Sequence, residues 1–487
     1  MISIRKFSFP TEYLVVILAL TLSLLAGIII NSVSRMLIIA EILIGLFVYR
    51  QYKILGVLVL LTAFSWYPIS SDQLSQISFL FTGASISSIF IIGLGIATLG
   101  MHFLMPNKVI SLFVPFIVLT ISTIGWLLTL PQAPYSQTYN SFRTLVYLMC
   151  VFIVCVKFIK TPKQAELICW LTLLSFTLST LIIYVGYYIY PLPFFFIPQD
   201  QVDALLTQAG RLQGAYQFPG AVAFSTWAPR LSGILASILL FPIVITINKG
   251  YRIGLRIVAL IIVLFLGVAL LRTGGRGGWL ALLAGFLVIW IVGVRYKAFG
   301  GISSITQIAL PVIALFAYAI YYLQSDNIFI QRINSMSAIA NDPSFTARVA
   351  FWQRNLEIWQ AHPSGIGFIS LQLRYGFFEH NAFLILLNGI GPFGLLSYLF
   401  FGGWVAFRCL KTIRNYKGVG QFIGLAALGS LVAVFLGGFV ENIPFLTDSF
   451  WFIWGSAVAL SYRIPVGMVS NITKIPYLHT DPITQNE

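Results

Sequence analysis

Many apolar stretches of about 20 residues follow one another along this chain, each long enough to cross the hydrocarbon core of a bilayer. Hydrophobic residues make up 59% of the 487 residues and charged residues only 9%, which excludes a water-soluble globular protein and a disordered one. The stretches are continuously apolar rather than alternating, which excludes a transmembrane β-barrel. The sequence therefore predicts an all-α, polytopic integral membrane protein.

We expect about 12 to 14 transmembrane helices, because three of the stretches are short. The first stretch is expected to be a span rather than a cleavable signal peptide, since no small-residue cleavage site follows it. The expected spans are residues 13–30, 36–49, 54–69, 85–105, 109–130, 142–158, 166–190, 229–247, 255–271, 277–294, 303–323, 382–407, 420–440 and 449–462.

The distribution of basic residues orients these spans, because cytoplasmic loops carry an excess of Lys and Arg. With the N-terminus in the cytoplasm, the inner segments hold 19 of the 29 basic residues and the outer segments hold 10. The net charge of +15 is therefore mainly an orientation signal rather than a sign of nucleic-acid binding. Both termini are expected to be cytoplasmic.

The outer basic residues are all arginine, whereas the 11 lysines all lie in inner segments. The guanidinium group offers a planar fork of donors that suits phosphate groups. Composition drift is the alternative explanation for this pattern. The outer arginines are Arg35, Arg143, Arg211, Arg230, Arg272, Arg276, Arg332, Arg348, Arg354 and Arg374.

Two outer loops, residues 191–228 and 324–381, are long enough to be functional. We expect three regions: N-terminal spans 1–190, a core of spans and loops 191–463, and a cytoplasmic tail 464–487. The second loop carries an apolar stripe at helical spacing, which predicts an amphipathic helix that starts near Pro343 and stops at His362-Pro363. This helix either packs on the spans or lies in the outer membrane interface. The stripe consists of Phe345, Val349, Trp352, Leu356 and Trp359.

His380 lies where this loop re-enters the membrane, between Glu379 and Asn381. A histidine between apolar stretches is unfavourable unless it is paired or used. Its ordinary pKa of about 6.5 suits general-base catalysis near neutral pH. His380 is either a catalytic residue or a satisfied boundary histidine.

The outer turn from Arg272 to Trp279 contains four glycines and Arg276. Glycines permit close approach of the backbone to a ligand, and a helix N-terminus follows, so the turn could hold a diphosphate. A tight helix–helix turn with arginines that reach to the interface is the alternative. No metal site is expected, because no Asp-x-Asp pair occurs, and no disulfide is expected, because the four cysteines lie in or at the inner ends of spans.

Several motifs together resemble the signature of the O-antigen ligase and polysaccharide polymerase superfamily. They are an "R…W…hP..G.G" loop within residues 351–367, an "HN" pair in 379–383 and a "G..G" turn in 388–394. Upstream, residues 211–214 resemble an "R..G" motif. Residues 273–278 resemble an "S-R-G" turn, although Gly275 replaces the serine. The resemblance covers roughly residues 200–440.

The resemblance implies a GT-C-like fold and a bacterial inner-membrane glycosyltransferase. Such an enzyme moves a glycan from undecaprenyl diphosphate to a hydroxyl acceptor on the periplasmic side, without metal or other cofactor. His380 would be the catalytic base, and Arg211, Arg276 and Arg272 would bind the donor diphosphate. Supporting roles are expected for Glu379, Asn381, Arg230 and Arg354.

The implied partners are a lipid-linked oligosaccharide donor, a glycan or lipid acceptor, membrane lipids and other polysaccharide-assembly proteins, but no nucleic acid. Polymerisation of the repeat units of a surface polysaccharide is the first expectation. Ligation to lipid A-core and protein O-glycosylation are alternatives within the same class. A small-anion transporter, such as a bicarbonate carrier, is the alternative from another class; it would need charged residues deep inside spans, where Glu41 is the clearest candidate.

Overall fold

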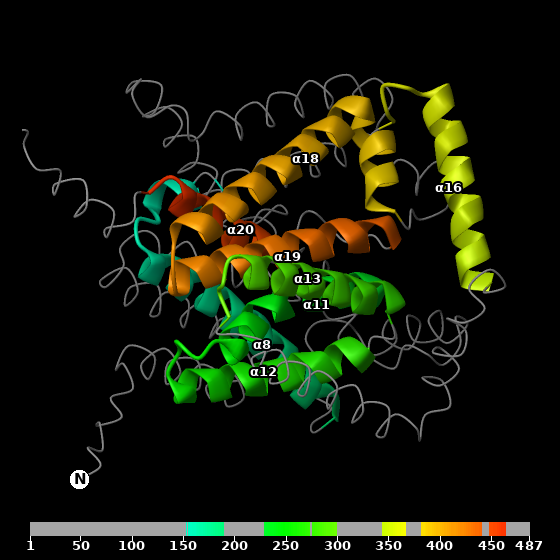
Figure 1. Ribbon diagram of the computed structural model, residues 1–487. Helices are drawn as coiled ribbons and strands as arrows, with labels where there is room; N and C mark the ends of the chain where they lie inside the picture. Colours follow the sequence, from blue (N-terminus) through cyan, green and yellow to red (C-terminus); the bar gives the residue numbers. More distant parts are fainter. Residues whose placement is uncertain are drawn as a thin grey trace, which may run out of the picture.

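The computed structural model describes residues 152, 154–188, 228–272, 275–299, 343–366, 381–440 and 448–463, and every regular element within these ranges is a helix (Figure 1). This confirms the all-α prediction for the described part of the chain. In chain order the helices are α8 (Pro162–Tyr188), α11 (Ala228–Ile247), α12 (Ile253–Arg272), α13 (Arg276–Arg295), α16 (Pro343–Ala361), α18 (Ala382–Asn415), α19 (Val419–Val440) and α20 (Asp448–Ser461).

Four of these helices, α12, α13, α18 and α19, are long and apolar enough to cross a membrane, which confirms a polytopic membrane protein. Their ends agree with the sequence prediction to within a few residues, except at the C-terminal end of α18; the span predicted at 277–294, for example, is helix α13. The predicted spans before residue 142 and at 303–323 lie outside the described residues. The division into regions 1–190, 191–463 and 464–487 stays a prediction.

Helix α13 lies at the centre of the bundle and packs closely on α11 and α19. A Cβ atom on Gly278 would lie 2.6 Å from the backbone of Ser232 on α11, so only glycine permits this approach. A Cβ atom on Gly429 of α19 would lie 2.9 Å from the carbonyl oxygen of Gly285. Farther along, the Gln421 side chain donates to the carbonyl of Tyr296 at 3.2 Å, so α13 and α19 run antiparallel.

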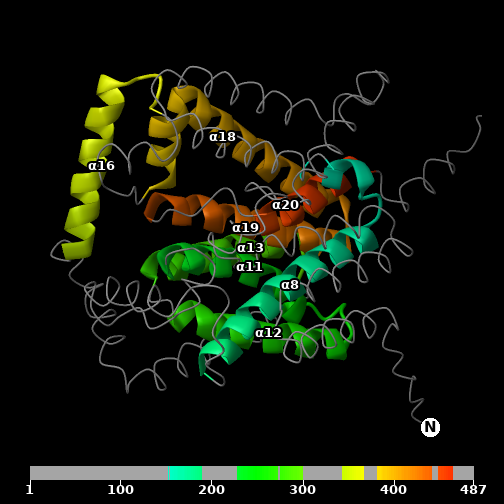
Figure 2. The ribbon, with the colours of Figure 1, turned by 180° about the vertical axis from the view of Figure 1, so that it is seen from behind.

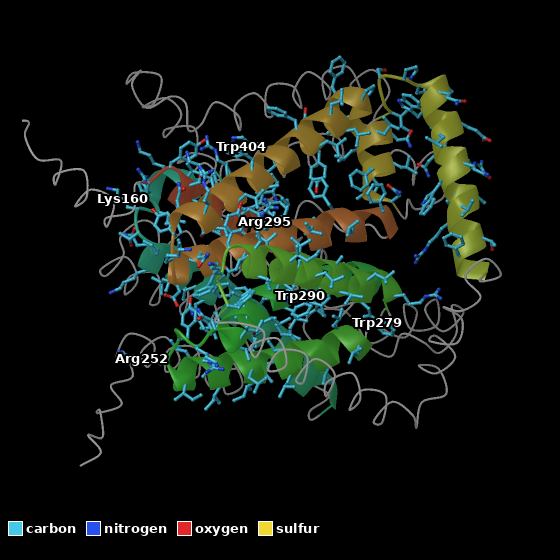
Figure 3. All side chains as sticks on the ribbon, in the orientation of Figure 1. Lys160, Arg252, Trp279, Trp290, Arg295 and Trp404 are labelled. Atoms are coloured by element: carbon cyan, nitrogen blue, oxygen red, sulfur yellow. The ribbon has the colours of Figure 1, made fainter. Side chains whose placement is uncertain are left out.

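One end of the bundle holds the described lysines, and we call it the lysine end. Contacts between helix ends hold it together: Arg463 donates to the carbonyl of Ile159, and the Tyr416 hydroxyl donates to the carbonyl of Arg463, each at 3.4 Å. Lys160, Arg252 and Arg295 lie toward this end in Figure 3. The lysine end comprises Lys157, Lys160, Lys163, Lys249, Lys297, Lys411 and Lys417.

The opposite end holds the first turns of α11, α13 and α18 and the last turns of α12 and α19. We call it the arginine end, because Arg230, Arg272 and Arg276 occupy these turns. No described lysine lies there. The sequence predicts that lysine is confined to one side of the membrane, and among the described residues lysine is confined to one end of the bundle, whereas arginine occurs at both ends.

Helix α18 is bent at Gly391-Pro392, where Gly391 has φ 68° and ψ −168°. Figures 1 and 2 show that its short first part, residues 382–390, turns away from the direction of the other bundle helices. Only residues 392–415 run back along the bundle. The span predicted at 382–407 lies within this helix. The prediction did not include the bend, which arises because proline removes a helical hydrogen bond and its ring clashes with the preceding turn.

Helix α16 stands apart from the bundle and crosses it at the arginine end, beside the first part of α18 (Figures 1 and 2). Its start at Pro343 and end at Ala361 confirm the predicted loop helix. Because α18 is bent, its first part runs across the bundle. Helix α16 faces this first part and runs across the bundle as well. Helix α16 therefore lies beside the end of the bundle that carries the arginines.

Candidate functional site

Arg276 opens helix α13 at the arginine end, and its side chain is half-buried. Gly275 precedes it in an extended conformation, with φ −78° and ψ 94°, and no side chain caps the helix there. The positive end of the helix dipole and the Arg276 guanidinium therefore act at the same place, an arrangement that favours an anion.

The glycines of this turn do not all have the same role. Gly278 is required by the contact of α13 with Ser232, which fits the helix–helix alternative for that residue. Trp279 reaches back, and its indole nitrogen donates to the carbonyl of Leu270 on α12 at 3.4 Å. Figure 3 shows Trp279 at the end of α13 that faces the α16 side of the molecule. These contacts fix the direction in which α13 starts.

Asn381, expected to have a supporting role, begins helix α18. Its side-chain oxygen accepts from the backbone N–H groups of Phe383 at 2.9 Å and Leu384 at 3.1 Å, which is a full N-cap. Its side-chain nitrogen donates to the carbonyl of Phe439, in the last turn of α19, at 3.1 Å. Asn381 therefore caps one helix and ties it to the end of another.

Arg276 and Asn381 lie at the same end of the bundle. The antiparallel register pairs Tyr296 with Gln421 and Gly285 with Gly429, so the first turn of α13 lies level with the last turn of α19. Phe439 belongs to that last turn and holds Asn381. Two motifs more than 100 residues apart in the sequence thus meet at one end of the fold.

The structure places the other predicted site residues as follows. Arg354 lies on α16 and is exposed. Arg230 and Arg272 occupy helix ends at the arginine end, but their side chains are outside the described residues. Arg211, Glu379 and His380 lie outside the described residues altogether. Their roles stay predictions.

The most buried face of α16 differs from the predicted apolar stripe by one residue position. Asn355 and Ile358 are buried, whereas Phe345 is 37% exposed and Leu356 is 42% exposed. Two contacts hold this side of α16 inward: Asn388 of α18 donates to the Asn355 side chain, and Ile358 packs against Ile366. The predicted apolar stripe lies about a quarter-turn around the helix from this buried face, on a side that is partly exposed.

The turn after α16 docks on the bend of α18. His362 ends the helix, and Gly365 has φ 89°, a conformation that favours glycine. Beyond it, the N–H group of Ile366 donates to the carbonyl of Asn388 at 2.6 Å. This turn follows the helix end that the sequence predicts at His362-Pro363.

The sequence motifs assign no role to Asn388 or to Asn355, although both lie within them. A usable signal was present. Pro392 cannot donate a hydrogen bond to the residue four positions earlier, which is Asn388. A free carbonyl inside an apolar helix calls for a partner from elsewhere, and here the partner comes from the turn at Ile366.

Within the described ranges no group of three or more His, Cys, Asp or Glu residues could hold a metal ion. Cys155, Cys169 and Cys409 are buried free thiols. Charged residues of the described bundle helices lie toward helix ends rather than near their middles.

Residues 260–399 match the model of the O-antigen ligase family. Over this stretch the chain is similar to the O-antigen ligase family. The match confirms the resemblance predicted from the sequence over this stretch. No curated protein matches the chain.

The matched stretch runs from α12 through α13 and α16 into α18, so it covers most of the arginine end. It includes Arg272, Arg276 and Asn381, whereas Arg211 and Arg230 lie before it. The match supports a membrane enzyme of the ligase or polymerase type that acts in polysaccharide assembly.

Proposed function

We propose that this chain is a GT-C-type membrane glycosyltransferase that uses undecaprenyl diphosphate glycans as donors and hydroxyl groups as acceptors. The observation that carries the proposal is the O-antigen ligase match over residues 260–399, a stretch that also contains His380. The arrangement of Arg276 and Asn381 at one end of the bundle supports it. The site would lie at the periplasmic face of the bacterial inner membrane, with both termini in the cytoplasm.

In the proposed reaction His380 takes the proton from the acceptor hydroxyl as its oxygen attacks the anomeric carbon of the donor sugar. The bond from that carbon to the diphosphate oxygen breaks, and the electron pair leaves with the lipid diphosphate. Direct displacement of this kind inverts the anomeric centre. His380 ends the step protonated and returns its proton to solvent.

The leaving diphosphate keeps its negative charge and gains more as the bond breaks. Arg211, Arg272 and Arg276 would hold it, with the N-terminus of α13 contributing its dipole. Arginine suits this role because its charge persists at all physiological pH values and its donors match two phosphate oxygens at once. The proposed enzyme therefore needs no metal.

Polymerisation of repeat units of an exopolysaccharide, a capsule or an O-antigen is the reaction we place first. Transfer to lipid A-core or to a protein hydroxyl would use the same chemistry with another acceptor. The partners in either case are a lipid-linked glycan, an acceptor, membrane lipids and other proteins of polysaccharide assembly.

The test uses the full-length protein in lipid nanodiscs and lipid-linked repeat units purified from a strain that lacks the gene. Formation of longer lipid-linked chains, unchanged by EDTA, is the expected result. Arg276→Ala should abolish it at equal protein amounts. Chain growth that stops with EDTA and returns with a divalent cation would contradict the metal-free mechanism. Transport of a small anion into vesicles without any change in the glycan would contradict the enzyme proposal itself.

A further inference from the structure

Helix α18 carries a face that changes from apolar to basic as the helix approaches the lysine end. Residues three or four positions apart lie on one side of a helix. Phe400 is 51% exposed and Phe407 is 62% exposed, and no atom lies within 4 Å of a Cβ atom added to Gly403 between them. We call these three residues the apolar strip. Lys411 and the exposed Arg414 continue the same side, so the strip leads directly to two basic side chains.

Arg408 lies at the edge of this face, next to the end of α20. Its guanidinium carbon is 3.8 Å from the centroid of the Tyr462 ring and 5.7 Å from that of Trp404. Figure 3 shows Trp404 on the part of α18 toward the end where Lys160 lies. The contact with Tyr462 uses the face of the guanidinium group, whereas its donors lie at the edge. The Arg408 side chain is half-buried, and its buried Nε atom has no hydrogen-bond partner.

Arg463 follows Tyr462 and brings a second guanidinium group to this corner of the bundle. One of its terminal nitrogens donates to the carbonyls of Val156 and Ile159, each at a long 3.4 Å. Its Nε atom is also buried without a partner. Figures 1 and 2 both show the end of α20 beside the start of α8 and the last turns of α18. Arg408 and Arg463 are therefore held where three helix ends come together.

No described carboxylate pairs with these two arginines. Glu166 is the only acidic residue that the described ranges contain at the lysine end, and its carboxylate lies beside Lys163 and Tyr251 instead. A half-buried cation without an anionic partner is unfavourable, because burial removes hydration that nothing replaces. The corner therefore favours an anion supplied by a ligand.

The apolar strip decides which anion suits this corner. A soluble phosphate would leave Phe400 and Phe407 unused, whereas a phospholipid carries its phosphate next to its acyl chains. Basic pockets between membrane helices bind the headgroups of anionic lipids in this way. An acyl chain can lie along the strip at Gly403, where no side chain stands, while guanidinium donors match two phosphate oxygens at once.

We propose that Arg408, together with Arg463, Lys411 and Arg414, binds the headgroup phosphate of one anionic phospholipid, whose acyl chain lies on the apolar strip. The bound phosphate bridges the ends of α18 and α20. This site lies at the lysine end, opposite Arg276, so the lipid that it holds is distinct from the donor of the proposed reaction. The inference goes beyond the proposed function and does not depend on it.

The first experiment measures lipid binding to the full-length protein in a neutral detergent by native mass spectrometry. The probes are phosphatidylglycerol and phosphatidylcholine with the same acyl chains. We expect one phosphatidylglycerol molecule to bind at least about tenfold more tightly than phosphatidylcholine, because the choline cation is repelled by the basic residues. Arg408→Gln should weaken phosphatidylglycerol binding about tenfold, as loss of a charge-assisted hydrogen bond does.

Arg252→Gln is the matched control for Arg408→Gln. Arg252 is an exposed arginine at the same end of the bundle, so the variant removes the same charge outside the proposed site. Its affinity for phosphatidylglycerol should stay within about twofold of wild type, since exposed charges contribute little to a site that they do not touch.

The second experiment separates a lipid from a free phosphate. Gly403→Leu places a side chain on the apolar strip and leaves every basic residue unchanged. It should weaken phosphatidylglycerol binding at least about threefold, and inorganic phosphate should displace the lipid from wild type only in large excess. Because Gly403 is exposed, this variant stays informative where Arg408→Gln lowers the yield of folded protein.

Three results would overturn the inference. The first is equal affinity of wild type for the two lipids. The second is an equal loss of affinity in Arg408→Gln and Arg252→Gln, which would indicate a general attraction to the basic surface. The third is displacement of the lipid by inorganic phosphate at equal concentration, with Gly403→Leu unchanged, which would assign the corner to a soluble phosphate.

Discussion

The side-chain nitrogen of Asn381 donates to the carbonyl of Phe439 at 3.1 Å and joins the first residue before α18 to the last turn of α19. A carbonyl in the last turn of a helix has no partner within that helix, so Asn381 satisfies an otherwise open acceptor. The same side chain caps α18. One residue thus determines where α18 starts and on which neighbour it rests.

Replacement of Asn381 should separate these two roles. Asn381→Asp keeps the N-cap but places an acceptor oxygen against the Phe439 carbonyl, so we expect a lower melting midpoint and a reduced transfer rate. Asn381→Ala loses both and should also lower stability by about 1 kcal/mol. Melting of the detergent-solubilised protein and initial transfer rates check the two effects. Equal rates for Asn381→Asp and wild type would show that the tie to Phe439 has no part in activity.

Arg276→Lys should reduce transfer at least about tenfold despite its unchanged charge, because lysine offers a point charge where the diphosphate calls for a planar fork. Arg295→Lys is the matched control. It lies in the last turn of the same helix, exposed at the lysine end, and should behave as wild type. Initial rates at several donor concentrations decide the matter. If both variants lose activity equally, the effect belongs to α13 as a whole and not to the arginine end.

Gly278→Ala should destabilise the bundle by about 1 to 3 kcal/mol, because the added methyl group meets the Ser232 backbone at 2.6 Å. Gly403→Ala tests the same substitution where no atom lies within 4 Å, and it should be neutral or slightly stabilising. The melting midpoint in detergent is the measurement. Equal midpoints for the two variants would contradict the close packing of α13 on α11.

Pro392→Ala restores an N–H group that can bond to the carbonyl of Asn388, in competition with Ile366. We expect a straighter α18, a released loop turn and faster cleavage of the 362–381 stretch by added protease in intact nanodiscs. Transfer activity should fall with it. The control is Pro242→Ala, a second proline inside a helix, in α11. If the two variants are cleaved at the same rate, the turn does not depend on the bend.

The spans could be predicted from the sequence because bilayer thickness sets their length and apolar composition marks their ends. The prediction for α13 was correct within a residue at each end, and the loop helix α16 began and ended where its proline and histidine signals indicated. The arginine end was also foreseeable, since charge asymmetry sorts loops between two sides.

The bend of α18 and the inward face of α16 were harder to predict. Both depend on hydrogen bonds between residues 22 to 33 positions apart: Ile366 to Asn388, and Asn388 to Asn355. Hydrophobic periodicity indicates only which apolar side chains are buried. In α16 a buried amide pair lies on the inward face, so the face predicted from periodicity is about a quarter-turn from the observed one. Pro392 signalled the break, but it did not indicate which segment would take the open carbonyl.

The central claim is tested most directly by replacing His380 with alanine at the native locus. The surface polysaccharide and lipid-linked glycans are then extracted and separated on a gel, with equal membrane insertion confirmed and His102→Ala as the control. We expect loss of long chains and accumulation of single lipid-linked repeats. Normal-length lipid-linked chains that fail to reach an acceptor would shift the assignment to a ligase. A glycan profile identical to wild type would contradict the account.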